Sequence, residues 1–126
     1  MKQKMIFCKD LQDNPSVLYL FGDNCERSGL GGQAGQMRGE PNAIGVATKK
    51  SPSFKDDAFF SDKDLIEFSK SVDIDLLPVY SHLQHGGSIV IPLDGLGTGL
   101  SQLLERAPQC YEYLNKQLNL LEKIGE

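Results

Sequence analysis

The chain has 126 residues, of which 40% are hydrophobic and 24% charged; these ordinary globular values argue against disorder and predict a single domain over residues 1–126. A net charge of −4 argues against a general affinity for nucleic-acid backbones, which attract basic surfaces. Apolar runs are too short for a secretory signal or a membrane span, and three widely spaced cysteines suit free thiols. We therefore expect a cytoplasmic protein without a membrane partner.

Four short apolar runs predict strands, separated by turn and helix signals. The second run, Val-Leu-Tyr-Leu-Phe, is apolar throughout, so we expect this strand to be central and covered on both faces. The strands are expected over residues 5–8, 17–21, 43–47 and 88–91, with a turn over residues 10–15 after the first.

Three stretches have helical patterns. They cover residues 33–38, 62–85 and 108–122. Within the second stretch, Pro78 favours a break into two helices, whereas Pro108 is well placed at the first position of the last one. Strands that alternate with helices predict a mixed or parallel sheet with helices packed on its faces.

Glycines gather in two places, with seven of the 13 within residues 22–45 and five within residues 86–99. One glycine-rich loop, at residues 22–32, follows the second strand, and the other, at residues 95–99, follows the fourth. Such loops leave backbone N–H groups free to face an anion, and ligands of open α/β sheets bind at the carboxyl ends of strands. The two loops therefore indicate a phosphate-binding site.

Two familiar nucleotide motifs are absent from the sequence. The glycines of residues 29–35 lack the Gly-x-Gly-x-x-Gly spacing of a dinucleotide-binding fold, and no Gly-Lys-Ser/Thr of a P-loop occurs. An alternative interpretation remains that the glycines serve only tight turns, in a domain that binds other proteins.

Three stretches of the sequence, taken in order, resemble the macrodomain family of ADP-ribose-binding modules. They are residues 18–34 (Leu-Tyr-Leu-Phe-Gly-Asp-Asn through Gly-Gly-Gln-Ala), residues 44–50 (Ile-Gly-Val-Ala-Thr-Lys-Lys) and residues 91–99 (Ile-Pro-Leu-Asp-Gly-Leu-Gly-Thr-Gly). The similarity is closest to the small macrodomains that remove ADP-ribose from glutamate side chains or DNA bases. It implies a three-layer α/β/α fold with a mixed sheet and helices on both faces.

The resemblance also implies residue roles around ADP-ribose or an ADP-ribosylated target, with no cofactor. Asp23 and Asn24 would lie by the adenine or the distal ribose, residues 31–33 would line the distal ribose and diphosphate, and residues 95–99 would cradle the phosphates. The candidate ligand-binding residues are Gly22, Asp23, Asn24, Gly31, Gly32, Gln33, Thr48, Asp94, Gly95, Leu96, Gly97, Thr98 and Gly99.

For catalysis, the resemblance implies that Lys49 attacks C1 of the ribose while an aspartate of the last loop acts as acid or base. A lysine does this only when burial or a neighbouring cation lowers its pKa, and Lys50 is the neighbour in sequence. The sequence departs from the family at Gly99, where the family has its aspartate, and the nearest carboxylate is Asp94. The catalytic candidates are therefore Lys49, Asp94 and Asp23.

Each candidate also has a simpler interpretation. Lys49 can be the solvated end of a strand, and Asp94 and Asp23 can be turn residues that bond local N–H groups. His82 and His85 share a helix face but lack further ligands, so no metal site is expected. Two hypotheses follow: an ADP-ribosyl hydrolase, or a module that binds ADP-ribose or a related nucleotide without turnover.

Overall fold

The computed structural model of the protein describes residues 1–125 and contains a four-stranded sheet. The strands are β1 (Lys2–Gln3), β2 (Val17–Asn24), β3 (Ala43–Lys49) and β4 (Ser88–Pro92), in the order β1-β4-β2-β3. Every pairing is parallel, so the mixed sheet that the resemblance implied is wrong, and the parallel alternative of the residue pattern is confirmed. The reason lies in the connections, because each passes through a helix and returns the chain in the same direction.

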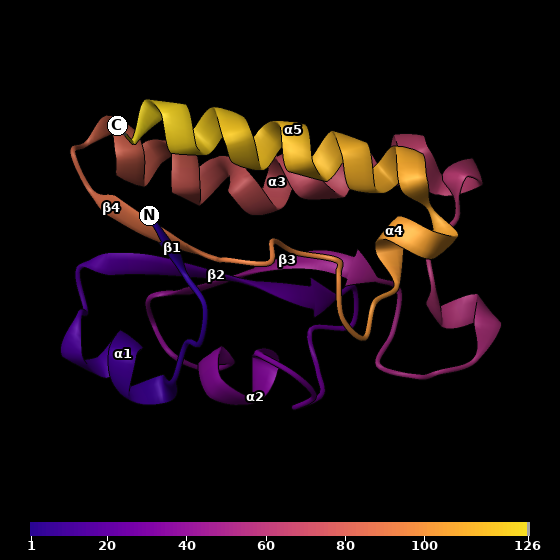
Figure 1. The fold of residues 1–126 in the computed structure, drawn as a ribbon, viewed down its shortest axis with the longest axis horizontal. Coiled ribbons are helices and arrows are strands. Elements are labelled where there is room, and N and C mark those ends of the chain that lie inside the picture. The colour runs from indigo at the N-terminus through magenta and orange to yellow at the C-terminus, as the bar shows by residue number, and fades with distance from the viewer. Residues whose placement is uncertain (126) are drawn as a thin grey trace.

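Helices cover both faces of this sheet and give three layers, α/β/α, as predicted. Figure 1 shows α3 and α5 side by side on one face and α1 and α2 on the other. The helices are α1 (Cys8–Asp13), α2 (Ala34–Met37), α3 (Leu65–Gln84), α4 (Leu103–Arg106) and α5 (Pro108–Ile124), with 3-10 turns η1 (Asp56–Ala58) and η2 (Asp62–Asp64). Among the described residues, no helix is both long and apolar enough to cross a membrane.

Strand β2 supplies side chains to two separate hydrophobic clusters. Leu20 packs with α3 and α5 on one side of the sheet, whereas Tyr19 and Phe21 pack with α1 and α2 on the other. All three are at most 3% exposed. The apolar run therefore does form an inner strand that is buried on both faces, as its composition predicted.

The N-terminal segment differs from the prediction. Residues 5–8 form no strand; the first strand is β1, and α1 occupies most of the expected turn. The Asp10 carboxylate accepts a hydrogen bond of 2.8 Å from the Phe7 N–H at the start of α1, which favours a helix here. Leu11 on this helix is 1% exposed.

The long helix α3 is continuous, so the predicted break at Pro78 is also wrong. Pro78 lies on the exposed side of the helix. It cannot donate a backbone hydrogen bond, but it takes the place of no core side chain. The opposite side is buried along its whole length through Phe68, Val72, Leu76, Val79 and Leu83. This packing outweighs the local preference of proline to end a helix.

Candidate functional site

A cavity of about 620 Å³ lies where β2, β3 and β4 end. Because the strands are parallel, their carboxyl ends meet at one edge of the sheet, and the loops that follow β2 and β4 form the walls. The volume falls within the range of roughly 300–1,000 Å³ that small-molecule sites occupy.

The cavity brings together all the candidate residues that the sequence indicated. Its walls include Gly22, Asp23, Asn24, Gly31, Gly32, Gln33, Thr48, Lys49, Asp94, Gly95, Leu96, Gly97, Thr98 and Gly99. Residues of three separate sequence motifs therefore surround one space, although their roles toward a ligand stay predictions.

The walls also contain residues that sequence reasoning missed. The additional ones are Lys4, Ser28, Gly29, Leu30, Ala34, Arg38, Pro52, Phe54, Pro92, Leu100 and Ser101. Arg38 had a visible signal, because it ends the short helical stretch directly behind the first glycine loop. Phe54 lies in an aromatic stretch for which the sequence left two interpretations open, a core segment or a flap that stacks on a base. Lys4 had no signal, since only the tertiary fold brings it here.

The two glycine loops approach each other closely. A Cβ atom added to Gly31 would lie 2.9 Å from Leu100 Cδ1, and one added to Gly22 would lie 4.0 Å from the backbone nitrogen of Gly97. Gly97 is buried with φ of +83°, and an added Cβ would lie 2.8 Å from Leu103 Cδ2. Larger residues therefore do not fit at Gly31 or Gly97 without displacing a neighbour.

Backbone N–H groups of the second loop are largely unpaired. Gly95 N–H donates to the Pro92 carbonyl, and the next intramolecular donors along the backbone are Gln102 and Leu103. Within residues 1–125, the N–H groups of residues 96–101 donate to no protein acceptor. Two of these residues, Leu96 and Gly97, are nevertheless buried. Unpaired N–H groups in a loop that lines a cavity can donate to an acceptor such as a phosphate oxygen.

The charges on the walls favour an anion. Three cations, Lys4, Arg38 and Lys49, and two carboxylates, Asp23 and Asp94, line the cavity. The walls therefore carry one excess positive charge in a chain whose net charge is −4. Since Asp23 is occupied by arginines, Asp94 is the one carboxylate on the walls that makes no ion pair or hydrogen bond within residues 1–125.

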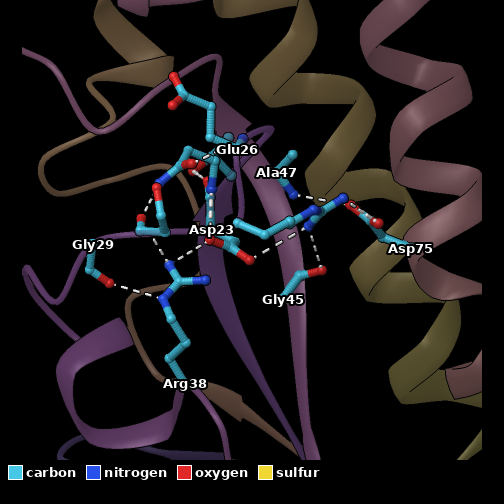
Figure 2. Close-up of polar contacts among 11 residues, drawn as sticks. Asp23, Glu26, Gly29, Arg38, Gly45, Ala47 and Asp75 are labelled. Carbon is cyan, nitrogen blue, oxygen red and sulfur yellow. Dashed lines mark hydrogen bonds and ion pairs between the residues drawn. The ribbon is translucent and has the colours of Figure 1, made fainter.

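Asp23 is the centre of an ion-pair network (Figure 2). Its Oδ1 accepts from Arg38 Nη2 at 2.6 Å and from the Asn24 N–H at 2.8 Å, while its Oδ2 lies 3.5 Å from Arg27 Nη1. The Asp23 side chain is only 4% exposed. Both oxygens are thus engaged, which suits a carboxylate that holds the loop in place more than a proton acceptor.

The network continues to α3 and covers the open edge of the sheet. Arg27 Nη2 lies 2.6 Å from Asp75 Oδ1, and Arg27 Nη1 donates to the Gly45 carbonyl at 3.1 Å. Asp75 Oδ2 accepts from the Ala47 N–H at 3.0 Å. Because β3 is an edge strand, these bonds satisfy two backbone groups that otherwise offer a place for another strand to pair.

An irregularity in strand pairing places Lys49. Asp23 pairs with Ala47 but Asn24 pairs with Lys49, so Thr48 is an extra residue, and its Oγ1 donates to the Asp23 carbonyl at 3.2 Å. Such bulges redirect the side chains beside them. Lys49 is 7% exposed and lines the cavity.

The Lys49 ammonium lies among aromatic rings. Nζ lies 4.5 Å from the Phe54 ring centroid and 4.6 Å from that of Phe59, and it donates to the Ser53 carbonyl at 2.7 Å. Burial, followed by the nearby Arg106 guanidinium, lowers the pKa of Lys49 below its ordinary value of 10.5.

The sequence suggested Lys50 as the cation that lowers the pKa of Lys49, but the cation in the structure is Arg106. Lys50 Nζ lies 3.3 Å from Asp64 Oδ2. Lys49 ends β3 and Lys50 follows it directly. Successive residues of an extended chain point to opposite sides, so the two lysine side chains have different surroundings.

Two further predicted residues differ in their hydrogen bonds: Asn24 has local partners, whereas Gln33 has an acceptor without one. Asn24 bridges its own turn, since its Nδ2 donates to the Ser28 carbonyl at 2.7 Å and its Oδ1 accepts from the Glu26 N–H at 3.0 Å. Gln33 Oε1 is buried without a hydrogen-bond partner in the described part of the chain. A buried acceptor of this kind costs about 1–3 kcal/mol, which a ligand that donates to it would recover.

Metal binding has no support from side-chain clusters. Within residues 1–125, no group of three or more His, Cys, Asp or Glu side chains is arranged to hold a metal ion.

Comparisons with known proteins give a family but no activity. No curated protein and no solved structure matches the chain. A family model described as "Family of unknown function (DUF7831)" matches residues 1–117. The chain therefore belongs to this family of unknown function.

Proposed function

We propose that the cavity binds ADP-ribose or a related nucleotide, and that the loop at residues 95–99 cradles its diphosphate. The single observation that carries this proposal is the row of N–H groups at residues 96–101 that have no acceptor within residues 1–125. The excess positive charge of the walls and the resemblance of the three sequence motifs to macrodomains support the same ligand class.

Titration calorimetry of the purified protein tests the proposal. ADP-ribose is titrated in parallel with ADP, AMP and NAD. We expect saturable binding of one ADP-ribose per chain, with weaker binding of AMP because it offers a single phosphate to the loop. Absence of binding to all four compounds would refute the proposal and leave only the fold.

A matched pair of substitutions at Thr98 tests the phosphate cradle itself. Thr98 is exposed and lies between Gly97 and Gly99, so we expect both Thr98→Asp and Thr98→Asn to fold normally. A carboxylate here repels a diphosphate, so Thr98→Asp should weaken ADP-ribose binding at least about tenfold. Asparagine has nearly the same shape as aspartate but no charge, so Thr98→Asn should bind ADP-ribose as the parent does. Equal affinities for the two variants would contradict a cradle at this loop.

A second candidate function is hydrolysis of an ADP-ribosyl linkage to a protein or nucleic acid. The lowered pKa of Lys49 at the cavity wall favours it, because only the neutral amine is a nucleophile. In this mechanism the amine attacks C1 of the ribose, the bond to the target oxygen or nitrogen breaks, and water then releases ADP-ribose from the lysine. Asp94 makes no ion pair or hydrogen bond within residues 1–125 and is the candidate acid or base, whereas Asp23 keeps its place in the ion-pair network.

The pH dependence of hydrolysis follows from the direction of that pKa shift. The rate should rise with pH as Lys49 loses its proton, with the midpoint of the rise below pH 10.5, the ordinary pKa of a lysine. Initial rates on ADP-ribosylated peptide across this range provide the measurement. Lys49→Arg should abolish hydrolysis because arginine stays protonated, while Lys50→Arg should retain it. A rate that is independent of pH, or an active Lys49→Arg variant, would exclude Lys49 as the nucleophile.

We also propose a cytoplasmic location. Cys8, Cys25 and Cys110 are all free thiols in the structure, which suits a reducing compartment.

A further inference from the structure

The guanidinium of Arg38 is fixed in the cavity wall with one nitrogen unused. Nε donates to the Gly29 carbonyl at 2.8 Å, and Nη2 donates to Asp23 Oδ1 at 2.6 Å and to the Ser28 carbonyl at 3.2 Å. Within residues 1–125, Nη1 has no acceptor, and Figure 2 shows it as the guanidinium nitrogen without a dashed line. The side chain is 19% exposed and lines the cavity.

Arg38 is the last residue of a chain of ion pairs. Its one carboxylate partner, Asp23, is shared with Arg27. Arg27 in turn reaches Asp75 on α3, so the network runs as alternating charges from α3 to the cavity. Arg27 and Asp75 lie outside the cavity walls, and the cationic end of the network faces the ligand space.

We propose that Arg38 binds a second phosphate, and that the site therefore selects a diphosphate over a single phosphate. The inference rests on the proposed function, in which the loop at residues 95–99 binds the first phosphate. The free Nη1 donates to a phosphate oxygen while Nε and Nη2 keep the guanidinium plane fixed. Asp23, Arg27 and Asp75 act as positioning residues that order Arg38 before the ligand arrives.

A fixed guanidinium suits this role better than a mobile lysine. Three of its donor contacts are already made by protein oxygens, so little rotational freedom is lost when the last nitrogen binds. Lys4 on the same cavity makes no such contacts within residues 1–125 and is a weaker candidate.

Pyrophosphate and inorganic phosphate are the probes, titrated calorimetrically into the full chain. The parent protein should bind pyrophosphate more tightly than phosphate. Arg38→Gln should weaken pyrophosphate binding roughly 10- to 100-fold, the effect of one charge-assisted hydrogen bond, and leave phosphate binding almost unchanged. Arg38→Lys keeps the charge and loses the planar fork, so its affinity for pyrophosphate should lie between those of the parent and of Arg38→Gln.

Two controls separate ligand contact from loss of positive charge or of loop order. Lys70→Gln removes one positive charge from an exposed position on α3 and should leave both affinities as in the parent. Arg27→Gln removes a positioning residue that lies outside the cavity, so it should weaken pyrophosphate binding clearly less than Arg38→Gln does. Thermal unfolding of each variant verifies that it is folded.

Three results would overturn the inference: equal affinity of the parent for the two anions, an equal loss of both anions in Arg38→Gln, or a loss in Arg27→Gln as large as in Arg38→Gln. Titration of the parent with ADP-ribose reports separately on the proposed function. If the protein binds pyrophosphate through Arg38 but does not bind ADP-ribose, the proposed nucleotide ligand is refuted and the diphosphate site at Arg38 stands.

Discussion

Asp23→Ala is expected to destabilise the protein by roughly 2–4 kcal/mol and to abolish nucleotide binding. The substitution leaves two arginines without their shared carboxylate and the Asn24 N–H without its acceptor. We place the loss below that of a fully buried pair because the Arg27 side chain is 42% exposed and retains Asp75. Binding fails because Arg38, at the end of α2, and the loop that carries Gly29 lose their anchor.

Urea unfolding and ADP-ribose titration measure the two effects. Asp23→Asn keeps an oxygen for the Asn24 N–H and should lose less stability than Asp23→Ala. Asp13→Ala removes an exposed carboxylate and should change the stability by less than about 0.5 kcal/mol. If Asp23→Ala unfolds at the same urea concentration as Asp13→Ala, the network does not hold the loop.

Gly97→Ala is expected to destabilise the protein by about 2–4 kcal/mol, combining a left-handed backbone conformation with a clash in a packed region. The added Cβ would lie 2.8 Å from Leu103 Cδ2 and 2.9 Å from Leu103 Cβ. Leu103 is 1% exposed and has no space to withdraw. The loop must therefore change its path, and its N–H groups no longer converge on the diphosphate.

Gly99→Ala is the matched control in the same loop. A Cβ on Gly99 meets nothing within 4 Å, and its φ lies outside the left-handed region, so the stability should be unchanged. Chemical unfolding of the two variants, followed by ADP-ribose titration, compares them directly. Similar stability and affinity for Gly97→Ala and Gly99→Ala would contradict the assigned role of Gly97.

The position of the cavity was predictable because its signals are local. A strand that is buried on both faces, followed by clustered glycines, places a loop at the carboxyl edge of a sheet wherever the rest of the chain goes. That reasoning brought the segments 22–33 and 93–99 to one cavity without knowledge of strand order.

Features that depend on distant contacts were not predictable. Asp23 pairs with Arg38 from beyond the glycine loop, and the cation near Lys49 is Arg106 from α4, not its neighbour in sequence. Strand direction depends on which crossover each helix makes, so the parallel sheet was not separable from a mixed one. Pro78 led to the wrong prediction of a break in α3, because helix propensity is local, whereas the burial of one whole side of α3 is a tertiary effect.

The central claim is that unpaired N–H groups of the second glycine loop bind a diphosphate, and amide NMR tests it most directly. ¹H–¹⁵N spectra of the protein are recorded during titration with ADP-ribose. We predict that the amide signals of Gly97, Thr98 and Gly99 shift strongly and saturate together, since new hydrogen bonds form at these donors. Saturable shifts confined to residues away from the cavity, or no shifts at all, would contradict the account.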